Sequence, residues 1–418
     1  MFRNYSEAGP ALLTDSAAKI RGSFILENTT TTIANTLRRA ILADTRSVGF
    51  RADLTNAEDP GVVIRKNTSV IFNEMLAHRL TLLPLGVVRI DDFNPADYEC
   101  VLQARVEGSE LRHVKASDFV VRKKGEDGQM VALGPEANAA MFPADPVSRD
   151  TCLLATLRPQ WSPDQRPEEV DLTAYPVIGT GKDFVGFCPV AQCTFENTPD
   201  TNPARQEEFF QEWLRTYKKI EDSSAVAPDL LEGHRKEWAT LGIQRCFLVD
   251  PFGQPNSFTF TVESVGIRPV RDIVAEGIRA VVALLRPFAD ANVEFGDIGV
   301  STRPVDSRMN GVDIVFEGQE HTLGNLLQTT ITEMFLDTGA PDSPITYAGY
   351  KIPHPLHKSM VLRLGIREGV ATPPEILARQ IVADAAAKAL ATFEDLARGW
   401  AAPAAAGVAA PNTGVLDG

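Results

Sequence analysis

The sequence predicts an α+β protein in which two similar units pair within one chain, and a β-rich lobe is inserted in the first unit. Three observations lead to this prediction: an internal repeat, a strand–helix ending shared by both units, and a long stretch that separates the two parts of the first unit. A lone unit of this size would expose an apolar face. Burial of the two faces against each other would give a pseudo-two-fold pair.

The repeat has an offset of 290 residues, from position 24 to position 314. Phe24–Leu37 (FILENTTTTIANTL) aligns without a gap with Ile314–Leu327 (IVFEGQEHTLGNLL). Each copy indicates a short strand, a polar turn and an amphipathic helix with Thr as the candidate N-cap. The identical pairs are Glu27/Glu317, Thr32/Thr322, Asn35/Asn325 and Leu37/Leu327.

Both units also end alike, with an apolar strand followed by a helix. The strands are predicted around Phe258–Val262 and Val361–Leu364, and the helices at Val270–Leu285 and behind Pro373 and Pro374. Apolar side chains recur at helical spacing in all four helices. We expect the two units to pair through Leu37, Ile41, Leu323, Leu327, Ile331, Ile278, Ile381 and Phe393.

These patterns divide the chain into four regions. The first unit is expected to comprise residues 1–48 and 241–300, with the β-rich lobe at 49–240. The second unit is expected at 301–400, followed by a disordered low-complexity tail at 401–418.

Composition limits the classes of protein. The 418 residues carry a formal charge of −14, which argues against a sequence-independent grip on nucleic acid. Five irregularly spaced cysteines favour a reducing compartment over a disulfide scaffold. No signal-peptide pattern or membrane-length apolar run is present, so we expect an intracellular, soluble protein.

Five motifs resemble the paired platform subunits of multisubunit DNA-dependent RNA polymerases. IANTLRRAIL (33–42), NEMLAHRLTLLPL (73–85) and FTFTVESVGIRPVRDIVAEGI (258–278) are similar to the larger subunit, which is bacterial α, archaeal D or the third subunit of polymerase II. HTLGNLL (321–327) and YAGYKIPHPLHKSMVLRL (347–364) resemble the smaller subunit, archaeal L or the eleventh subunit of polymerase II.

The resemblance implies α-subunit-type dimerisation units, each an antiparallel sheet with two helices. It implies a non-catalytic assembly platform for the two largest polymerase subunits, with small zinc-binding subunits as further partners. It implies no strong direct binding of nucleic acid, no membrane partner and no homo-oligomer. The fusion resembles the arrangement in large eukaryotic DNA viruses, which implies the host cytoplasm and virion, or otherwise the nucleus.

Candidate partner-binding residues follow from the same motifs. Arg38 and Arg39 are replaced by Gln328 and Thr329 in the second copy, which would supply the asymmetry needed to bind two different large partners. In the family the matching arginines face the second-largest subunit. Asn35 of the same motif, and His78 and Arg79 of the second motif, are expected at the same kind of interface.

The remaining candidates have two interpretations each. Phe209, Phe210 and Trp213 lie in a polar setting and indicate either a helix core or a partner surface. His78 shares a helix face with Glu74, which favours a structural hydrogen bond over a metal or acid–base site. His354 and His357 favour a rigid loop over zinc.

Cys188 and Cys193 favour buried apolar side chains over metal ligands, because two thiolates do not complete a tetrahedral site. We therefore expect no cofactor, metal or catalytic residue. The alternatives are a duplicated interaction module outside transcription and a metal-dependent enzyme that uses Glu74, His78 and the cysteine pair.

Overall fold

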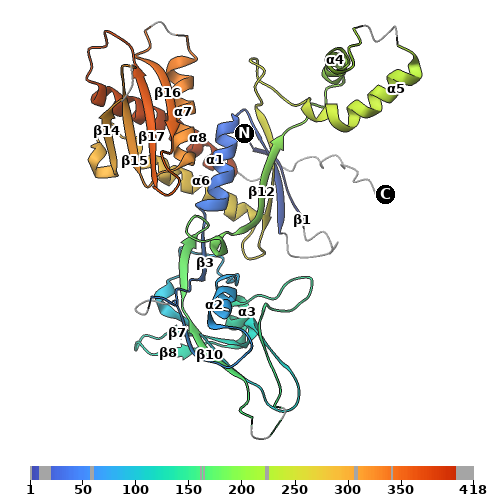
Figure 1. Cartoon of the computed structure of the whole chain (residues 1–418), viewed down its shortest axis with the longest axis vertical. Helices are drawn as coiled ribbons and strands as arrows, with labels where there is room; N and C mark the ends of the chain where they lie inside the picture. The colour runs from blue at the N-terminus through green and yellow to red at the C-terminus, as the bar shows by residue number, and fades with distance from the viewer. Residues whose placement is uncertain are drawn as a thin grey trace.

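The computed structural model describes residues 2–8, 20–56, 61–160, 162, 165–221, 226–305, 309–339 and 342–401. The predicted tail therefore lies outside the described residues, apart from Ala401. The fold class is confirmed: the chain is α+β with antiparallel sheets. It consists of two pairing units, a lobe and a helical arm (Figure 1).

The first pairing unit is a four-stranded sheet of order β1-β2-β13-β12 with two helices. Alternation of buried phenylalanines with half-buried threonines in β13 gives the sheet one apolar face, on which α6 packs. The elements are β1 (Phe2–Ala8), β2 (Arg21–Glu27), α1 (Thr31–Ala43), β12 (Val190–Asn197), β13 (Ser257–Ser264) and α6 (Val270–Leu285).

The second pairing unit repeats this arrangement, with the order β14-β15-β17-β16. Its central strands keep the register of the first unit: Glu27 pairs with Ser257, and the equivalent Glu317 pairs with Ser359. The elements are β14 (Val300–Pro304), β15 (Gly311–Glu317), α7 (His321–Ile331), η10 (Thr332–Leu336), β16 (Ile345–Lys351), β17 (Ser359–Ile366) and α8 (Pro374–Ala401).

The helices of the two units pack against each other between the sheets (Figure 1). α1 contacts α7, and α6 contacts α8. One hydrophobic cluster runs through both sheets and all four helices. A single core therefore joins the two halves of the chain.

The lobe follows α1 and forms a second hydrophobic core. Its main sheet has the order β4-β10-β5-β7-β8, and two further strand pairs flank it. The elements are β3 (Arg46–Phe50), β4 (Val62–Asn67), α2 (Asn73–Thr81), η1 (Pro95–Asp97), β5 (Tyr98–Arg105), β6 (Arg112–Lys115), η2 (Ala116–Asp118), β7 (Phe119–Lys124), β8 (Met130–Ala132), α3 (Pro135–Met141), β9 (Leu153–Leu157), β10 (Glu169–Ala174), β11 (Pro176–Thr180) and η3 (Val185–Phe187).

The arm, residues 198–256, projects from the first unit between β12 and β13 (Figure 1). It contains α4 (Pro203–Trp213), η4 (Leu214–Lys218), α5 (Pro228–Glu237), η6 (Trp238–Gly242) and η7 (Ile243–Arg245). The structure thus divides the predicted lobe, 49–240, differently. Because β12 returns to the sheet of the first unit, the lobe and the arm are two separate insertions.

The N-cap prediction is right for one copy of the repeat and wrong for the other. The Thr30 side chain accepts the N–H of Ile33 at the start of α1. In α7 the N-cap is Glu320, whose side chain makes no capping hydrogen bond. Thr322 lies inside the helix, where its hydroxyl is free to contact the other unit.

Candidate pairing interface and partner surfaces

The eight residues predicted to pair the units all belong to the shared core. Each is at most 2% exposed, and the cluster contains side chains from α1, α6, α7 and α8. Burial of a Leu or Ile side chain contributes roughly 1.5–3 kcal/mol. The residues are Leu37, Ile41, Leu323, Leu327, Ile331, Ile278, Ile381 and Phe393.

Two polar contacts show that the α1–α7 pair has pseudo-two-fold symmetry. The hydroxyls of Thr32 and Thr329 share a hydrogen bond of 3.2 Å. Arg39 Nε donates to Thr322 Oγ1 at 2.8 Å. Thr32 aligns with Thr322, and Arg39 aligns with Thr329, so one contact is the symmetry copy of the other. Such self-complementary contacts are typical of an isologous interface.

The arginine pair of the first helix is therefore split between two roles. Arg39 is half-buried and donates a hydrogen bond to the other unit of its own chain, whereas the sequence predicted contact with a separate partner subunit. Arg38 is also half-buried, and its Nε donates to Asn35 Oδ1 at 3.0 Å. The equivalent Gln328 accepts the backbone N–H of Tyr350 instead. Arg38 and Asn35 thus form a polar feature that the second unit does not repeat.

The ends of the described chain meet at an aromatic cluster. Trp400, near the end of α8, lies edge-on to Phe2, Tyr5 and Phe24. Its Nε1 donates to the carbonyl of Arg271, and Arg271 donates back to the carbonyl of Trp400. The second unit therefore holds the first strand of the first unit.

A buried ion pair connects the lobe to the first unit. Arg268 and Glu276, each with a side chain 6% exposed, are 2.5 Å apart. Arg46 of β3 donates through its backbone N and its Nε to Glu276, and through Nη2 to Asp91 at 2.7 Å. Arg268 also donates to the carbonyl of Arg46 at 3.0 Å. These bonds hold the base of the lobe against α6.

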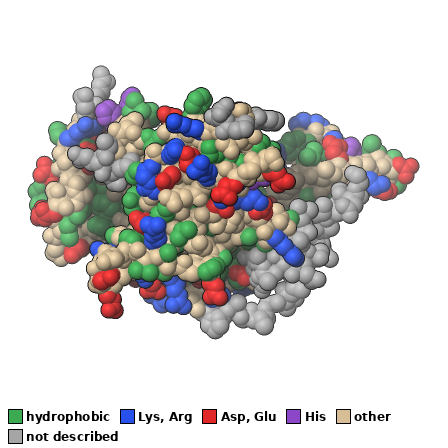
Figure 2. Space-filling model, turned by 90° about the horizontal axis from the view of Figure 1, so that it is seen from below, with side chains coloured by type: hydrophobic (Ala, Val, Ile, Leu, Met, Phe, Trp, Pro, Cys, Tyr) green, Lys and Arg blue, Asp and Glu red, His purple; other side chains and the backbone are tan. Residues whose placement is uncertain are grey.

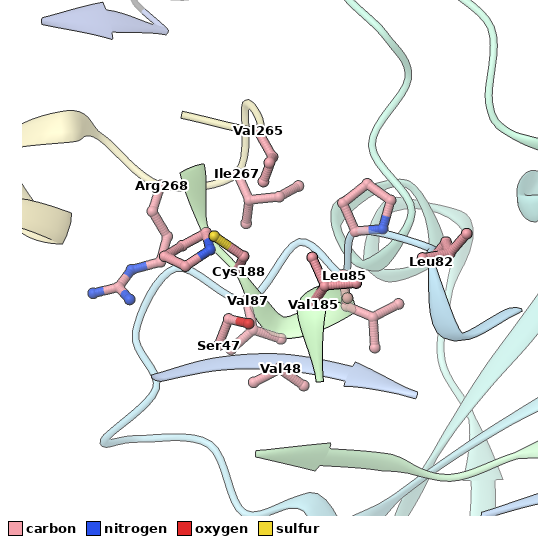
Figure 3. Close-up of a pocket in the computed structure, with 13 residues that line it drawn as sticks. Ser47, Val48, Leu82, Leu85, Val87, Val185, Cys188, Val265, Ile267 and Arg268 are labelled. Carbon is pink, nitrogen blue, oxygen red and sulfur yellow. The ribbon is translucent and has the colours of Figure 1, made fainter. Parts of the chain in front are cut away.

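Beside this ion pair lies an apolar pocket of about 200 Å³, shown in Figure 3. Leu82 and Leu85 of the second motif line it from the lobe, and Val265 and Ile267 line it from the first unit. Leu82 and Val265 are exposed. The second motif therefore builds the junction between the lobe and the first unit.

His78 and Arg79 are both exposed on α2. Arg79 donates to the carbonyl of Leu154, which ties α2 to the lobe strand β9. His78 and Glu74 line one cleft, but no hydrogen bond joins them in the described structure, so the predicted structural bond is wrong.

The aromatic cluster of the arm is mainly a core. Phe210 is fully buried and packs with Leu214 and Trp238, so its prediction as a partner contact is corrected. Phe209 and Trp213 are half-buried and pack on the same cluster. They stay candidates for a partner surface.

The described residues offer no obvious metal site. No group of three or more His, Cys, Asp or Glu side chains among them is placed to hold an ion. Cys193 is buried, which raises the pKa of its thiol to about 12, and Cys188 donates to the carbonyl of Val190. The rings of His354 and His357 lie 5.2 Å apart on an exposed loop.

Sequence reasoning missed the contacts that depend on the pairing geometry. The Arg39–Thr322 bond, the Arg46–Glu276 bonds and the Trp400 cluster all join residues far apart in the chain. The sequence held one signal for the Arg39–Thr322 bond. Thr322 is identical to Thr32 in the repeat, but Thr30 is the residue that caps α1, so the shared threonine has a role other than capping.

The surface charge is mixed on the face seen from below. On the face seen from below, basic and acidic side chains are interspersed (Figure 2). No helix within the described ranges combines the length and the apolarity needed to cross a bilayer.

Comparison with known proteins identifies both pairing units. Residues 23–285 and residues 311–398 each match a family model described as the RNA polymerase Rpb3/Rpb11 dimerisation domain. The first match spans the first unit from β2 onward, including its two insertions, and the second spans most of the second unit.

Relatives come from eukaryotes and archaea. DNA-directed RNA polymerase II subunit RPB3 of Schizosaccharomyces pombe is 27% identical over 61% of this chain and 78% of its own length. Human DNA-directed RNA polymerases I and III subunit RPAC1 is 25% identical over 62% and 77%. Subunit Rpo3 of Methanosphaera stadtmanae is 28% identical over 50% and 71%. The chain belongs to the RNA polymerase Rpb3/Rpb11 dimerisation domain family.

Proposed function

We propose that this chain is the non-catalytic assembly platform of a DNA-dependent RNA polymerase, with both members of the platform pair in one polypeptide. The observation that carries the proposal is the single core formed by two units of this family. The relatives are polymerase subunits by name.

The partners we propose are the two largest polymerase subunits, together with small zinc-binding subunits on the lobe. Arg38 and Asn35 support an interface because they form a polar pair on only one of the two equivalent helices. His78, Arg79, Phe209 and Trp213 extend the candidate surface. We propose no catalytic role and no stoichiometric metal for the isolated chain. A viral source stays a prediction based on the fusion.

Because its halves already pair internally, we propose that the isolated chain is a monomer. Linking two binding units raises their effective concentration to about the millimolar range, which disfavours pairing with a second chain. A stable homodimer at micromolar concentration in light scattering would contradict this.

The test is purification of the tagged full chain from its native source, followed by mass spectrometry of the intact complex. Recovery of two subunits larger than roughly 100 kDa, a size typical of multidomain chains, supports the proposal. A complex without polymerase subunits would favour an interaction module outside transcription. Metal-dependent activity of the isolated chain would favour an enzyme.

A further inference from the structure

The most exposed large apolar side chains lie on the turns that shortly precede the equivalent strands β13 and β17. Phe252 is 87% exposed and precedes β13, while Leu356 is 84% exposed and precedes β17. These are the highest exposures among the large apolar side chains in the described ranges. Single exposed apolar residues are common on proteins, so exposure alone decides little. Their recurrence shortly before equivalent strands requires an explanation.

The two turns are also built alike. The sequences are Asp-Pro-Phe at 250–252 and His-Pro-Leu at 354–356. Asp250 Oδ1 accepts the N–H of Phe252 at 2.9 Å, and His354 Nδ1 accepts the N–H of Leu356 at 3.2 Å. The intervening proline fixes the backbone φ. The backbone of each turn is therefore constrained before any partner binds, which lowers the ordering cost of binding.

The turn after β2 and the turn after β15 each donate one backbone hydrogen bond to the end of the loop, from donors that differ by one position in the repeat. Thr29 N donates to the carbonyl of Asn256 at 3.2 Å, and Gly318 N donates to the carbonyl of Lys358 at 2.6 Å. Asn28 and Gly318, which align in the repeat, both have left-handed φ values of 55° and 72°. Glycine adopts this conformation freely, and asparagine tolerates it better than most residues. The hydrogen bond at the end of each loop thus belongs to the duplicated fold, while Phe252 itself lies in the last part of the arm.

We propose that Phe252 and Leu356 are apolar anchors that insert into nonpolar pockets of folded protein partners. The proposal rests on the proposed function, which supplies those partners as the two largest polymerase subunits. Aromatic and aliphatic anchors on rigid elements are a common centre of protein interfaces.

Nucleic acid is the less suitable partner for these turns. A phenyl ring can stack on a base, but the side chain of Leu356 has no ring to stack. The net charge of −14 also opposes binding of phosphate. A protein pocket accepts both side chains.

The test is a competition in cells that make the polymerase. Wild-type chain and one variant carry different tags, and quantitative mass spectrometry measures the large subunits captured on each. We expect Phe252→Ala and Leu356→Ala each to capture about tenfold less of at least one large subunit. Phe252→Leu and Leu356→Phe should restore capture, because a nonpolar pocket accepts either side chain.

The control is Leu230→Ala, which removes a side chain 54% exposed on the arm but outside either turn. It should capture both large subunits normally. Normal capture by both alanine variants would overturn the inference, as would equal loss with Leu230→Ala, no rescue by the apolar exchanges, or loss of single-stranded nucleic acid with Phe252→Ala. If wild-type chain captures no large subunit, the proposed function itself fails.

Discussion

The two pairing units share a sheet order, a register and a helix contact, but they differ in their connections. In the second unit, η10 lies between α7 and β16, and a short loop joins β16 to β17. In the first unit, the same two positions hold the lobe and the arm. The duplicated fold is therefore a scaffold, and the asymmetry needed for different partners is carried by insertions and single substitutions.

The buried ion pair also distinguishes the two units. The Arg268–Glu276 pair lies where the lobe joins the first unit, and it contacts β3, a strand without a counterpart in the second unit. This placement indicates that the pair fixes the lobe and is not required by the duplicated fold.

The largest expected effect comes from breaking that pair. Glu276→Ala should cost about 3–5 kcal/mol in the free energy of unfolding, because it leaves Arg268 buried without its carboxylate. Urea denaturation measures the loss, and hydrogen exchange should show faster opening of β3. Asp395→Ala, which removes an exposed ion-pair partner, is the control. A cost no greater than that of the control would contradict the assigned role.

Substitutions at equivalent core positions of the two units should lower the free energy of unfolding by similar amounts. Leu37 and Leu327 align in the repeat and are both fully buried, so Leu37→Ala and Leu327→Ala should each cost about 2–5 kcal/mol. Thermal or urea unfolding should show one transition in both variants, because the core is continuous. Separate transitions for the two units would show that pairing contributes little to their stability.

The duplicated scaffold was predictable because its signal is local. Helical spacing marked Leu37, Leu327, Ile278 and Ile381 without reference to any other segment. The single insertion predicted for the first unit was wrong because β12 is a strand of ordinary apolar and polar residues, and only its partner β13 identifies its sheet.

Side-chain roles were less predictable. An Arg on an amphipathic helix gives the same sequence pattern whether it contacts a separate protein or the other half of its own chain, as Arg39 does. Phe210 in the arm shows the same limit: the sequence could not choose between a core and a surface, and the packing of Trp238 decides it.

Arg38 and Arg39 allow the two units to be compared at single equivalent positions. Arg38→Glu should reduce recovery of the second-largest subunit, because reversal of an interface charge costs typically ~2–5 kcal/mol of binding, with the folding stability nearly unchanged. Gln328→Glu at the equivalent position is the matched control. Normal recovery with Arg38→Glu would place the asymmetry in the lobe or the arm.

Arg39 should behave differently from its neighbour. Arg39→Ala should cost about 1 kcal/mol of folding stability, because it removes the hydrogen bond to Thr322 between the units. Thr329→Ala, its symmetry copy, should cost no more, since it removes a neutral bond to Thr32. Thermal melting of the isolated variants measures both. If Arg39→Ala leaves the melting temperature unchanged but blocks assembly, Arg39 instead contacts a partner subunit, as the sequence predicted.

The smallest expected effect concerns one cross-strand pair at the same register in both units. In the second unit Asp313 faces Arg363, which donates two hydrogen bonds of 2.6 and 2.9 Å to its carboxylate. In the first unit the equivalent residues are Ser23 and Thr261, which carry no charge. The Arg363 guanidinium holds the pKa of Asp313 below its ordinary value.

A lowered pKa fixes the sign of the pH dependence. The carboxylate adds stability above its unfolded pKa of about 3.9, and that stability is lost as the pH falls through the folded pKa. Replacing the pair by the residues of the first unit, Asp313→Ser with Arg363→Thr, should therefore flatten the fall in stability on acidification below about pH 4. Urea midpoints measured on both sides of that pH test the change, with Asp395→Asn of an exposed ion pair as control. An unchanged acid profile would mean that Asp313 has the same pKa in the folded and the unfolded chain, which the two short bonds from Arg363 argue against.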